Sequence, residues 1–184
     1  MASRMRAKLS LPVSPRDHVR GPASAPVTLV EYGDYECPYC GAAYPIVKEI
    51  QEAMGENLRF VFRNFPLTQI HPHAERAAEA AEAAGAQDHF WQMHDLLYEN
   101  QRTLDDAHLL RFALVVGLDV ERFTRELESG VHHARVREDF LSGARSGVNG
   151  TPSFFINDIR HDGSWEFEPL LLALERELQR TRAA

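Results

Sequence analysis

The chain has few cysteines, no long apolar run and no excess of basic residues. Two cysteines among 184 residues are too few for the disulfide framework of a small secreted domain. No stretch is long and apolar enough to cross a membrane, so we expect no membrane partner. The net charge of −7 at neutral pH argues against nucleic acid as a partner, because nucleic-acid binding requires a basic face. What remains is an ordinary globular composition, 44% hydrophobic and 26% charged, sufficient for a core without disulfides.

The start of the chain lacks the pattern of a secretory signal. Arg4, Arg6 and Lys8 are followed by mixed residues that include Pro12 and Pro15, whereas a signal needs an apolar run after its basic start. We therefore expect residues 1–16 to be a disordered lead and the protein to be cytoplasmic. Thiols stay reduced in that compartment, which favours a catalytic or sensing role for the two cysteines over a structural one.

Both cysteines lie in one short stretch, Cys37-Pro38-Tyr39-Cys40. The β-prone residues 27–33 precede it, and the helical pattern of residues 38–54 follows it. We therefore expect Cys37 at a helix N-terminus, where unpaired backbone N–H groups and the helix dipole favour the reactive thiolate. Two cysteines at this spacing can close and reopen a small disulfide, Cys37–Cys40, which is typical of a thioredoxin-like redox motif.

The first part of the chain predicts a β-α-β unit. Residues 27–33 form the first strand, residues 38–54 a helix with a kink at Pro45, and residues 58–63 a second strand parallel to the first. A short edge strand is expected within residues 17–26.

The rest of the chain changes from helical to strand patterns. Residues 73–145 carry helical spacing only, and Thr103 to Asp106 match a capping pattern. Strand signals return at residues 153–156 and 159–161, and a final helix opens at Glu168-Pro169. The order predicts an α/β fold with a mixed sheet, β-α-β and then β-β-α, and an all-helical insertion. We predict a disordered lead at 1–16, one domain from 17–66 and 148–182, and an inserted helical subdomain at 67–147.

This order resembles the DsbA-like branch of the thioredoxin superfamily from about residue 17 to residue 178. Three local matches carry the resemblance: the Cys37 to Cys40 motif after a strand; Glu31, where members carry a buried acid; and Gly150-Thr151-Pro152, where the family has its cis-proline. The resemblance implies a thioredoxin fold and a bacterial, signal-less protein disulfide oxidoreductase.

The expected roles of the motif residues follow from their chemistry. Cys37 is the expected nucleophile, with its sulfur exposed, and the more buried Cys40 resolves the mixed disulfide. Pro38 should rigidify the loop. Tyr39 carries no charge at neutral pH, where the best-known secreted oxidase of the family has His, so we expect Cys37 to be less acidic than in the strongest oxidants.

Three further sites carry expectations. Burial of Glu31 in an apolar strand should raise the pKa of its carboxyl, which could then exchange protons with Cys40; a solvated Glu at a sheet edge is the alternative. The resemblance implies that a cis Thr151–Pro152 bond leaves the Thr151 backbone free to pair with an extended substrate and keeps metals from the thiols. Residues 34–36 form either an acidic approach to the site or a solvated loop.

The histidines are expected at the surface or at helix ends rather than in a zinc site. This expectation covers His71, His73, His132 and His133.

The sequence therefore predicts a thiol-disulfide oxidoreductase that acts on protein or small-thiol disulfides through a mixed disulfide on Cys37. It needs no bound cofactor or metal, because the cysteine pair carries both electrons, and we expect a monomer. One alternative is a glutaredoxin-like, glutathione-dependent reductase, which the chain length and helical insertion disfavour. Another is a non-catalytic redox sensor or metal-thiolate protein, for which two cysteines alone cannot complete an iron–sulfur cluster. Oxidase, reductase and isomerase directions stay open.

Overall fold

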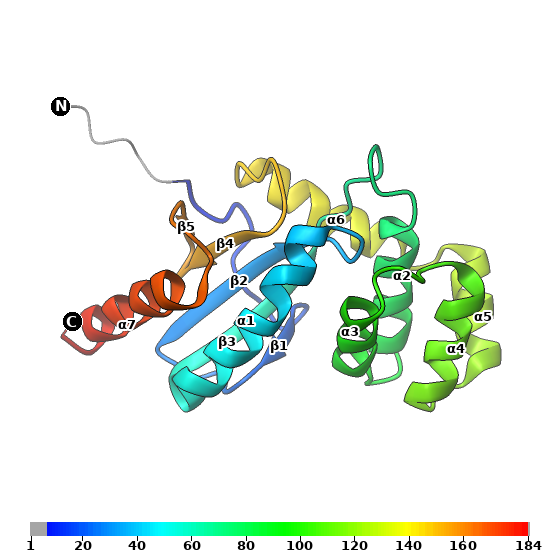
Figure 1. Cartoon of the computed structure of the whole chain (residues 1–184), viewed down its shortest axis with the longest axis horizontal. Coiled ribbons are helices and arrows are strands. Elements are labelled where there is room, and N and C mark those ends of the chain that lie inside the picture. The colour runs from blue at the N-terminus through cyan, green and yellow to red at the C-terminus, as the bar shows by residue number, and fades with distance from the viewer. Residues whose placement is uncertain (1–6, 184) are drawn as a thin grey trace. The chain divides into compact units, whose positions relative to one another are not determined.

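A single sheet organises the strands of the chain. The structure is a computed structural model that describes residues 7–183. Within that range five strands form a mixed sheet in the order β1-β3-β2-β4-β5 (Figure 1). The strands are β1 (His18–Arg20), β2 (Val27–Gly33), β3 (Leu58–Asn64), β4 (Ser153–Ile156) and β5 (Ile159–His161). The pairs β1–β3, β2–β4 and β4–β5 are antiparallel.

The chain divides into two compact units. Among the described residues, the first contains 7–32, 42–63 and 142–183, and so carries nearly all of the sheet. The second contains Gly33–Gly41 and Asn64–Leu141, which places the cysteine motif in the same unit as most of the helices.

Two long helices accompany the sheet in the first unit. These are α1 (Pro38–Met54), whose first turn belongs to the second unit, and α7 (Phe167–Ala183). Both lie on the viewer's side of the strands in Figure 1. Helix α1 has the predicted bounds and continues through Pro45 into a 3-10 turn at Gly55–Asn57. Leu170 and Leu174 are the fully buried residues of α7, and their spacing explains why a helix forms there.

The second unit is built around an alanine-rich helix. Its elements are α2 (Ala74–Gly85), α3 (Phe90–Glu99), α4 (Asp106–Val116), α5 (Val120–Ser129) and most of α6 (His133–Arg145). Helix α2 packs against α3, α4 and α5, and its small side chains let three neighbours approach it closely. The expected cap at Thr103 is wrong: Asp105 caps α4 by accepting the N–H groups of Ala107 and His108, since a carboxylate directly before the helix reaches those donors.

The N-terminal segment is not the disordered lead that the sequence predicts, as far as it is described. Residues 1–6 lie outside the described residues, but from residue 7 the chain is bonded to the sheet unit. Leu9 donates its N–H to the carbonyl of Asp158, and Ser10 donates its N–H to Ser146 Oγ, both at 2.9 Å. The expectation failed because a segment without periodicity can still be ordered by contacts with distant residues. We call residues 7–14 the N-terminal strap.

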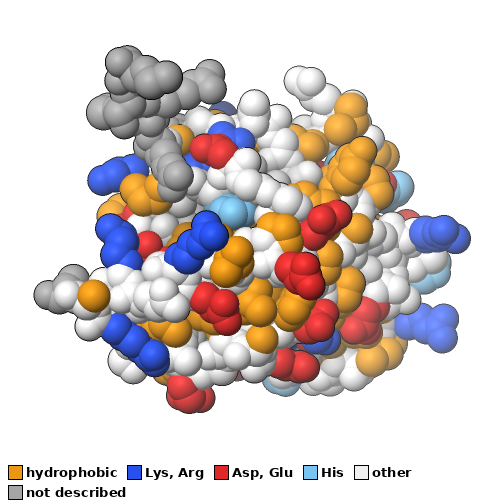
Figure 2. Space-filling view, turned by 60° about the vertical axis from the view of Figure 1, so that its left-hand side comes forward, with side chains coloured by type: hydrophobic (Ala, Val, Ile, Leu, Met, Phe, Trp, Pro, Cys, Tyr) orange, Lys and Arg blue, Asp and Glu red, His pale blue; other side chains and the backbone are white. Residues whose placement is uncertain are grey.

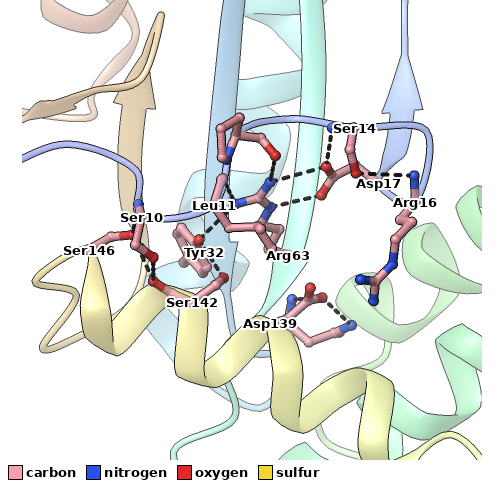
Figure 3. Close-up of polar contacts among 12 residues, drawn as sticks. Ser10, Leu11, Ser14, Arg16, Asp17, Tyr32, Arg63, Asp139, Ser142 and Ser146 are labelled. Atoms are coloured by element: carbon pink, nitrogen blue, oxygen red, sulfur yellow. Dashed lines mark hydrogen bonds and ion pairs between the residues drawn. The ribbon is translucent and has the colours of Figure 1, made fainter.

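Arg63, a buried arginine, donates hydrogen bonds to the backbone of the strap (Figure 3). The Arg63 guanidinium donates to both carboxylate oxygens of Asp17, at 2.8 and 3.1 Å, and to the Tyr32 hydroxyl at 3.0 Å. It also donates to the carbonyls of Leu11, at 2.8 Å, and Pro12, at 3.2 Å. All five of its N–H donors are thus used. Burial lowers the pKa of Arg63, but its bonds to Asp17 and Tyr32 outweigh burial and raise it, so the group stays charged.

The predicted fold is therefore confirmed, with strands and helices in the predicted order. The strand at residues 27–33, the helices α2 to α6 and the hairpin at residues 153–161 all lie where the sequence pattern predicts them. The Asn157-Asp158 turn of the hairpin has positive φ at both residues, 43° and 69°, as a tight hairpin requires.

Candidate active site

Cys37 occupies the residue directly before helix α1. Its carbonyl accepts the N–H of Gly41 at 3.0 Å, the first bond of the helix, which makes Cys37 the N-cap. Its own N–H donates to the Asp34 carbonyl at 3.2 Å. The side chain of an N-cap faces the free N–H groups of the first turn. A thiolate at this position is therefore stabilised by those donors and by the helix dipole.

The two thiols are both buried. Cys37 is 3% exposed and Cys40 is 0% exposed, so the expected exposure of the Cys37 sulfur is wrong for this conformation. The two residues between the cysteines, Pro38 and Tyr39, are exposed. Both cysteines are free thiols here, and the reversible Cys37–Cys40 disulfide remains a prediction.

Asp34, three residues before Cys37, makes several hydrogen bonds in the motif loop. Its N–H lies 3.5 Å from Cys40 Sγ and donates to it. Its carboxylate accepts the N–H groups of Glu36 and Leu67, each at 2.8 Å, and bonds His71 Nδ1 at 2.7 Å. Asp34 is 1% exposed, so the expectation of a solvated or approach-forming acid does not hold for it. The sequence did not indicate this burial, because the three donors that compensate it include Leu67 and His71, which lie far along the chain.

Two neighbours of Asp34 also bond to the helical part of this unit. Tyr35 is buried, and its hydroxyl lies 3.0 Å from Nδ1 of His94 on α3. The Glu36 carboxylate accepts the His73 N–H at 2.6 Å and bonds His73 Nδ1 at 3.0 Å. Asp34 and Glu36 thus each bond a histidine of the connection between β3 and α2. These bonds attach the motif loop to that connection, so the loop is not simply solvated.

Gln101 makes the third connection to the motif. It lies between α3 and α4, and its Nε2 donates to the carbonyls of Tyr35, at 2.9 Å, and Cys37, at 2.8 Å. An ideal Cβ added to Gly41 would lie only 2.0 Å from Gln101 Oε1. The sequence offered one signal for this contact, a glycine directly after the second cysteine, inside a helix that glycine disfavours.

The remaining predicted site residues lie in the sheet unit. Glu31 sits on β2, faces Phe154 across the β2–β4 pair and is 3% exposed, which rules out the solvated edge position. The Thr151–Pro152 peptide bond is cis and immediately precedes Ser153, the residue that pairs with Tyr32. Beside Pro152 lies a cavity of about 210 Å³, lined also by Phe154 and by Trp165.

A second cluster of buried charge lies in the helical unit, apart from the motif. Asp139 on α6 pairs with Arg135 and accepts the Asn64 N–H at 3.1 Å. Asn64 also donates to Glu82 at 2.7 Å. Burial raises the pKa of Asp139 to about 6; Arg135 opposes the rise and Glu82 adds to it.

Within residues 7–183 the histidines form no cluster that could hold a metal ion. Among residues 7–183 no group of three or more potential ligands is placed to hold a metal ion. The histidine pair on α6 and before it bonds carboxylates instead, His132 with Glu126 and His133 with Glu75 and Glu79. On the face drawn in Figure 2, Lys and Arg side chains are scattered among acidic and hydrophobic ones. No helix within residues 7–183 combines the length and apolarity needed to cross a bilayer.

The sheet order, the inserted helices and a cysteine pair at the start of α1 define a thioredoxin-like oxidoreductase fold. A family model described as Thioredoxin matches residues 13–176. The chain is similar to the thioredoxin-like oxidoreductase from Silicibacter pomeroyi DSS-3, with 32% identity, a TM-score of 0.78 and coverage of 93% of this chain and 95% of that one. In fold it is similar to α-DsbA1 of Wolbachia pipientis, with 20% identity, a TM-score of 0.82 and coverage of 95% and 96%. The chain belongs to the thioredoxin family.

The curated relatives that it matches are much longer proteins. The chain is 50% identical over 175 residues to a protein named Na(+)/H(+) antiporter NhaA 1 from Salinispora arenicola, which covers 95% of this chain and 27% of that protein. The chain thus spans about a quarter of that relative.

Proposed function

We propose that this protein exchanges electrons between the Cys37/Cys40 pair and disulfides of proteins or small thiols. The observation that carries the proposal is the N-cap position of Cys37, whose carbonyl closes the first turn of α1. That position supplies the thiolate on which disulfide exchange depends. No bound cofactor takes part, because the two sulfurs hold the electron pair.

The proposed reaction proceeds in two balanced steps. The Cys37 thiolate attacks one sulfur of a substrate disulfide, the substrate S–S bond breaks, and one substrate thiolate leaves. The thiolate of Cys40 then attacks Cys37 Sγ, which releases the second substrate thiolate and forms the Cys37–Cys40 disulfide. Two electrons pass to the substrate, and the two thiol protons of the protein end on the two substrate thiols. The reverse sequence oxidises a substrate dithiol.

Two residues of the sheet unit complete the proposal. Glu31 is proposed to accept and return the Cys40 proton, and its burial at 3% exposure supports this role, because a desolvated carboxyl binds a proton more readily. Thr151 and Pro152 are proposed to present the Thr151 backbone to an extended substrate, with the neighbouring cavity beside Pro152 receiving a substrate side chain. A cytoplasmic location and a monomeric state stay predictions, to be checked by cell fractionation and light scattering.

The test is the equilibrium of the cysteine pair in glutathione buffers, read as a mass shift after thiol trapping. We expect one reversible two-electron transition, lost in both Cys37→Ser and Cys40→Ser and kept in Ala53→Ser, an exposed position on α1. The Cys40→Ser variant should accumulate a mixed disulfide on Cys37. Absence of a reversible transition in the unchanged protein refutes the proposal. Full turnover of glutathione disulfides by Cys40→Ser would instead indicate the glutaredoxin-like, monothiol mechanism.

The longer relatives are named for sodium–proton antiport. The match covers 27% of the relative from Salinispora arenicola, and the features that support the present proposal belong to the cysteine motif.

A further inference from the structure

We propose that Gln101 is a positioning residue for the nucleophile: it holds the Cys37 backbone at the end of α1, and Gly41 leaves the space that it occupies. This inference rests on the proposed function, in which Cys37 is the attacking thiol. No motif in the sequence points to Gln101, which lies far along the chain in the connection between α3 and α4.

The hydrogen bonds fix the orientation of the Gln101 amide. Both N–H groups of Nε2 point to carbonyl oxygens, those of Tyr35 and Cys37, at 2.9 and 2.8 Å. With the amide turned over, Oε1 would face two carbonyl oxygens, and three acceptors would meet without a donor. The network therefore allows one orientation, with the positive end of the amide dipole toward Cys37.

This contact bears on thiol reactivity through the backbone. The Cys37 carbonyl is shared between Gln101 and the N–H of Gly41, and the Cys37 N–H bonds the Asp34 carbonyl. Both polar groups of the nucleophile's backbone are thus held. Because the stabilisation of a thiolate by a helix N-terminus falls off within the first turn, a small displacement of Cys37 reduces it. Gln101 therefore determines how strongly the N-terminus of α1 stabilises the Cys37 thiolate.

Gly41 gives the inference a distinctive test. A Cβ on Gly41 would lie 2.0 Å from Oε1, 2.6 Å from Cδ and 3.0 Å from Nε2 of Gln101. The three nearest of these atoms all belong to that one flexible side chain, so Gly41→Ala has to displace it. The displaced amide loses both carbonyls, and Gly41→Ala is then equivalent to Gln101→Ala at the active site.

The experiment measures alkylation of Cys37 by iodoacetamide in the Cys40→Ser background, read by peptide mass, across pH 5–9. Variants are Gln101→Ala, Gln101→Glu, Gly41→Ala and the double Gly41→Ala/Gln101→Ala. Asn100→Ala is the matched control, because Asn100 lies in the same connection and its side-chain amide donates to the Leu96 carbonyl rather than to the motif. Circular dichroism verifies that each variant is folded.

We expect Gln101→Ala, Gly41→Ala and the double variant to share one alkylation profile, shifted to higher pH, and the control to keep the original profile. Gln101→Glu, which brings a negative charge to the same place, should shift it furthest, by about one pH unit, or about tenfold in rate near neutrality. With Cys40 intact, the glutathione equilibrium of Gln101→Glu should move about tenfold toward the disulfide, about 30 mV, because the reduced form loses stabilisation.

Two results overturn the inference: an unchanged profile in Gln101→Ala or Gln101→Glu, or separate, additive shifts from Gly41→Ala and Gln101→Ala. An equal shift in Asn100→Ala would also refute it, by showing general loosening of the connection. The alkylation readout needs no redox cycle. Failure of the proposed function, seen as a missing glutathione couple in the unchanged protein, is therefore distinguishable from failure of the role of Gln101.

Discussion

The buried ion pair of Arg63 and Asp17 offers the sharpest test of what orders the N-terminal strap. Their side chains are 1% and 5% exposed, and the carboxylate receives two of the five guanidinium donors. The perturbation is Asp17→Asn, which keeps the shape, removes the charge and turns an amide N–H group toward a guanidinium N–H group. Arg63 then stays charged in a site without its counter-charge.

The expected magnitude follows from that uncompensated charge. Removing one partner of a buried ion pair destabilises by about 3–5 kcal/mol, and the remaining bonds to Tyr32 and to the Leu11 and Pro12 carbonyls favour the lower figure, about 3 kcal/mol. For a chain of this size that lowers the melting temperature by about 6–12 °C. Arg63→Met should have a similar effect. The double variant Asp17→Asn/Arg63→Met should be more stable than the sum of the two losses by about 2 kcal/mol, since neither charge remains.

Urea unfolding followed by tryptophan fluorescence measures the stabilities. Hydrogen exchange read by mass spectrometry measures the strap, because the amides of Leu9 and Ser10 are bonded to the sheet unit and should lose protection in Arg63→Met. Additive losses in the double variant would refute the pairing argument. Unchanged protection of residues 7–14 in Arg63→Met would show that the serine and backbone bonds hold the strap without the arginine.

Two further predictions concern the second unit. The pKa of Asp139 in the folded state, about 6, lies above its ordinary value of 3.8. Between these two values the folded state keeps a proton that the unfolded state has lost, so stability falls as the pH rises from about 4 to about 6. Asp139→Asn should remove up to about 3 kcal/mol of that fall, measured as the difference between the two urea-unfolding pH profiles; parallel profiles would contradict it. Asp34→Asn should lose about 2 kcal/mol of stability, because one oxygen that accepts from Leu67 and His71 is replaced by a donor. Asp158→Asn, at an exposed turn position, should be neutral in the same urea-unfolding assay.

Local patterns predicted the elements because their determinants are local. The apolar run at residues 27–33 and the helical spacing at residues 38–54 give β2 and α1 their bounds. Asp119 caps the start of α5, and Gly130, in the left-handed conformation, ends it. Each of these features depends on residues within a turn or two of one another, which a single sequence displays directly.

The features that sequence reasoning missed depend on contacts between distant residues. Arg63 occupies a polar position in the alternating pattern of β3, where an exposed side chain is expected. It is nevertheless 1% exposed, because Asp17 and the strap enclose it. Asp34 reads as a loop acid, but His71 and two backbone donors bury it. Gln101 reaches the motif across 64 residues. In each case one polar side chain satisfies donors or acceptors that the local sequence does not reveal.

The strap also decides where this protein can be shortened. The family match begins at residue 13. A chain that began there would still contain every named strand and helix of the described residues, because β1 begins at His18. It would nevertheless lack the Leu11 and Pro12 carbonyls, two acceptors of the Arg63 guanidinium. It would also lack the hydrogen bonds of Ser10 to Ser142 and Ser146 at the end of α6. A purification tag attached ahead of residue 7 leaves those acceptors in place. The folding boundary of this protein therefore lies several residues outside its boundary of family similarity.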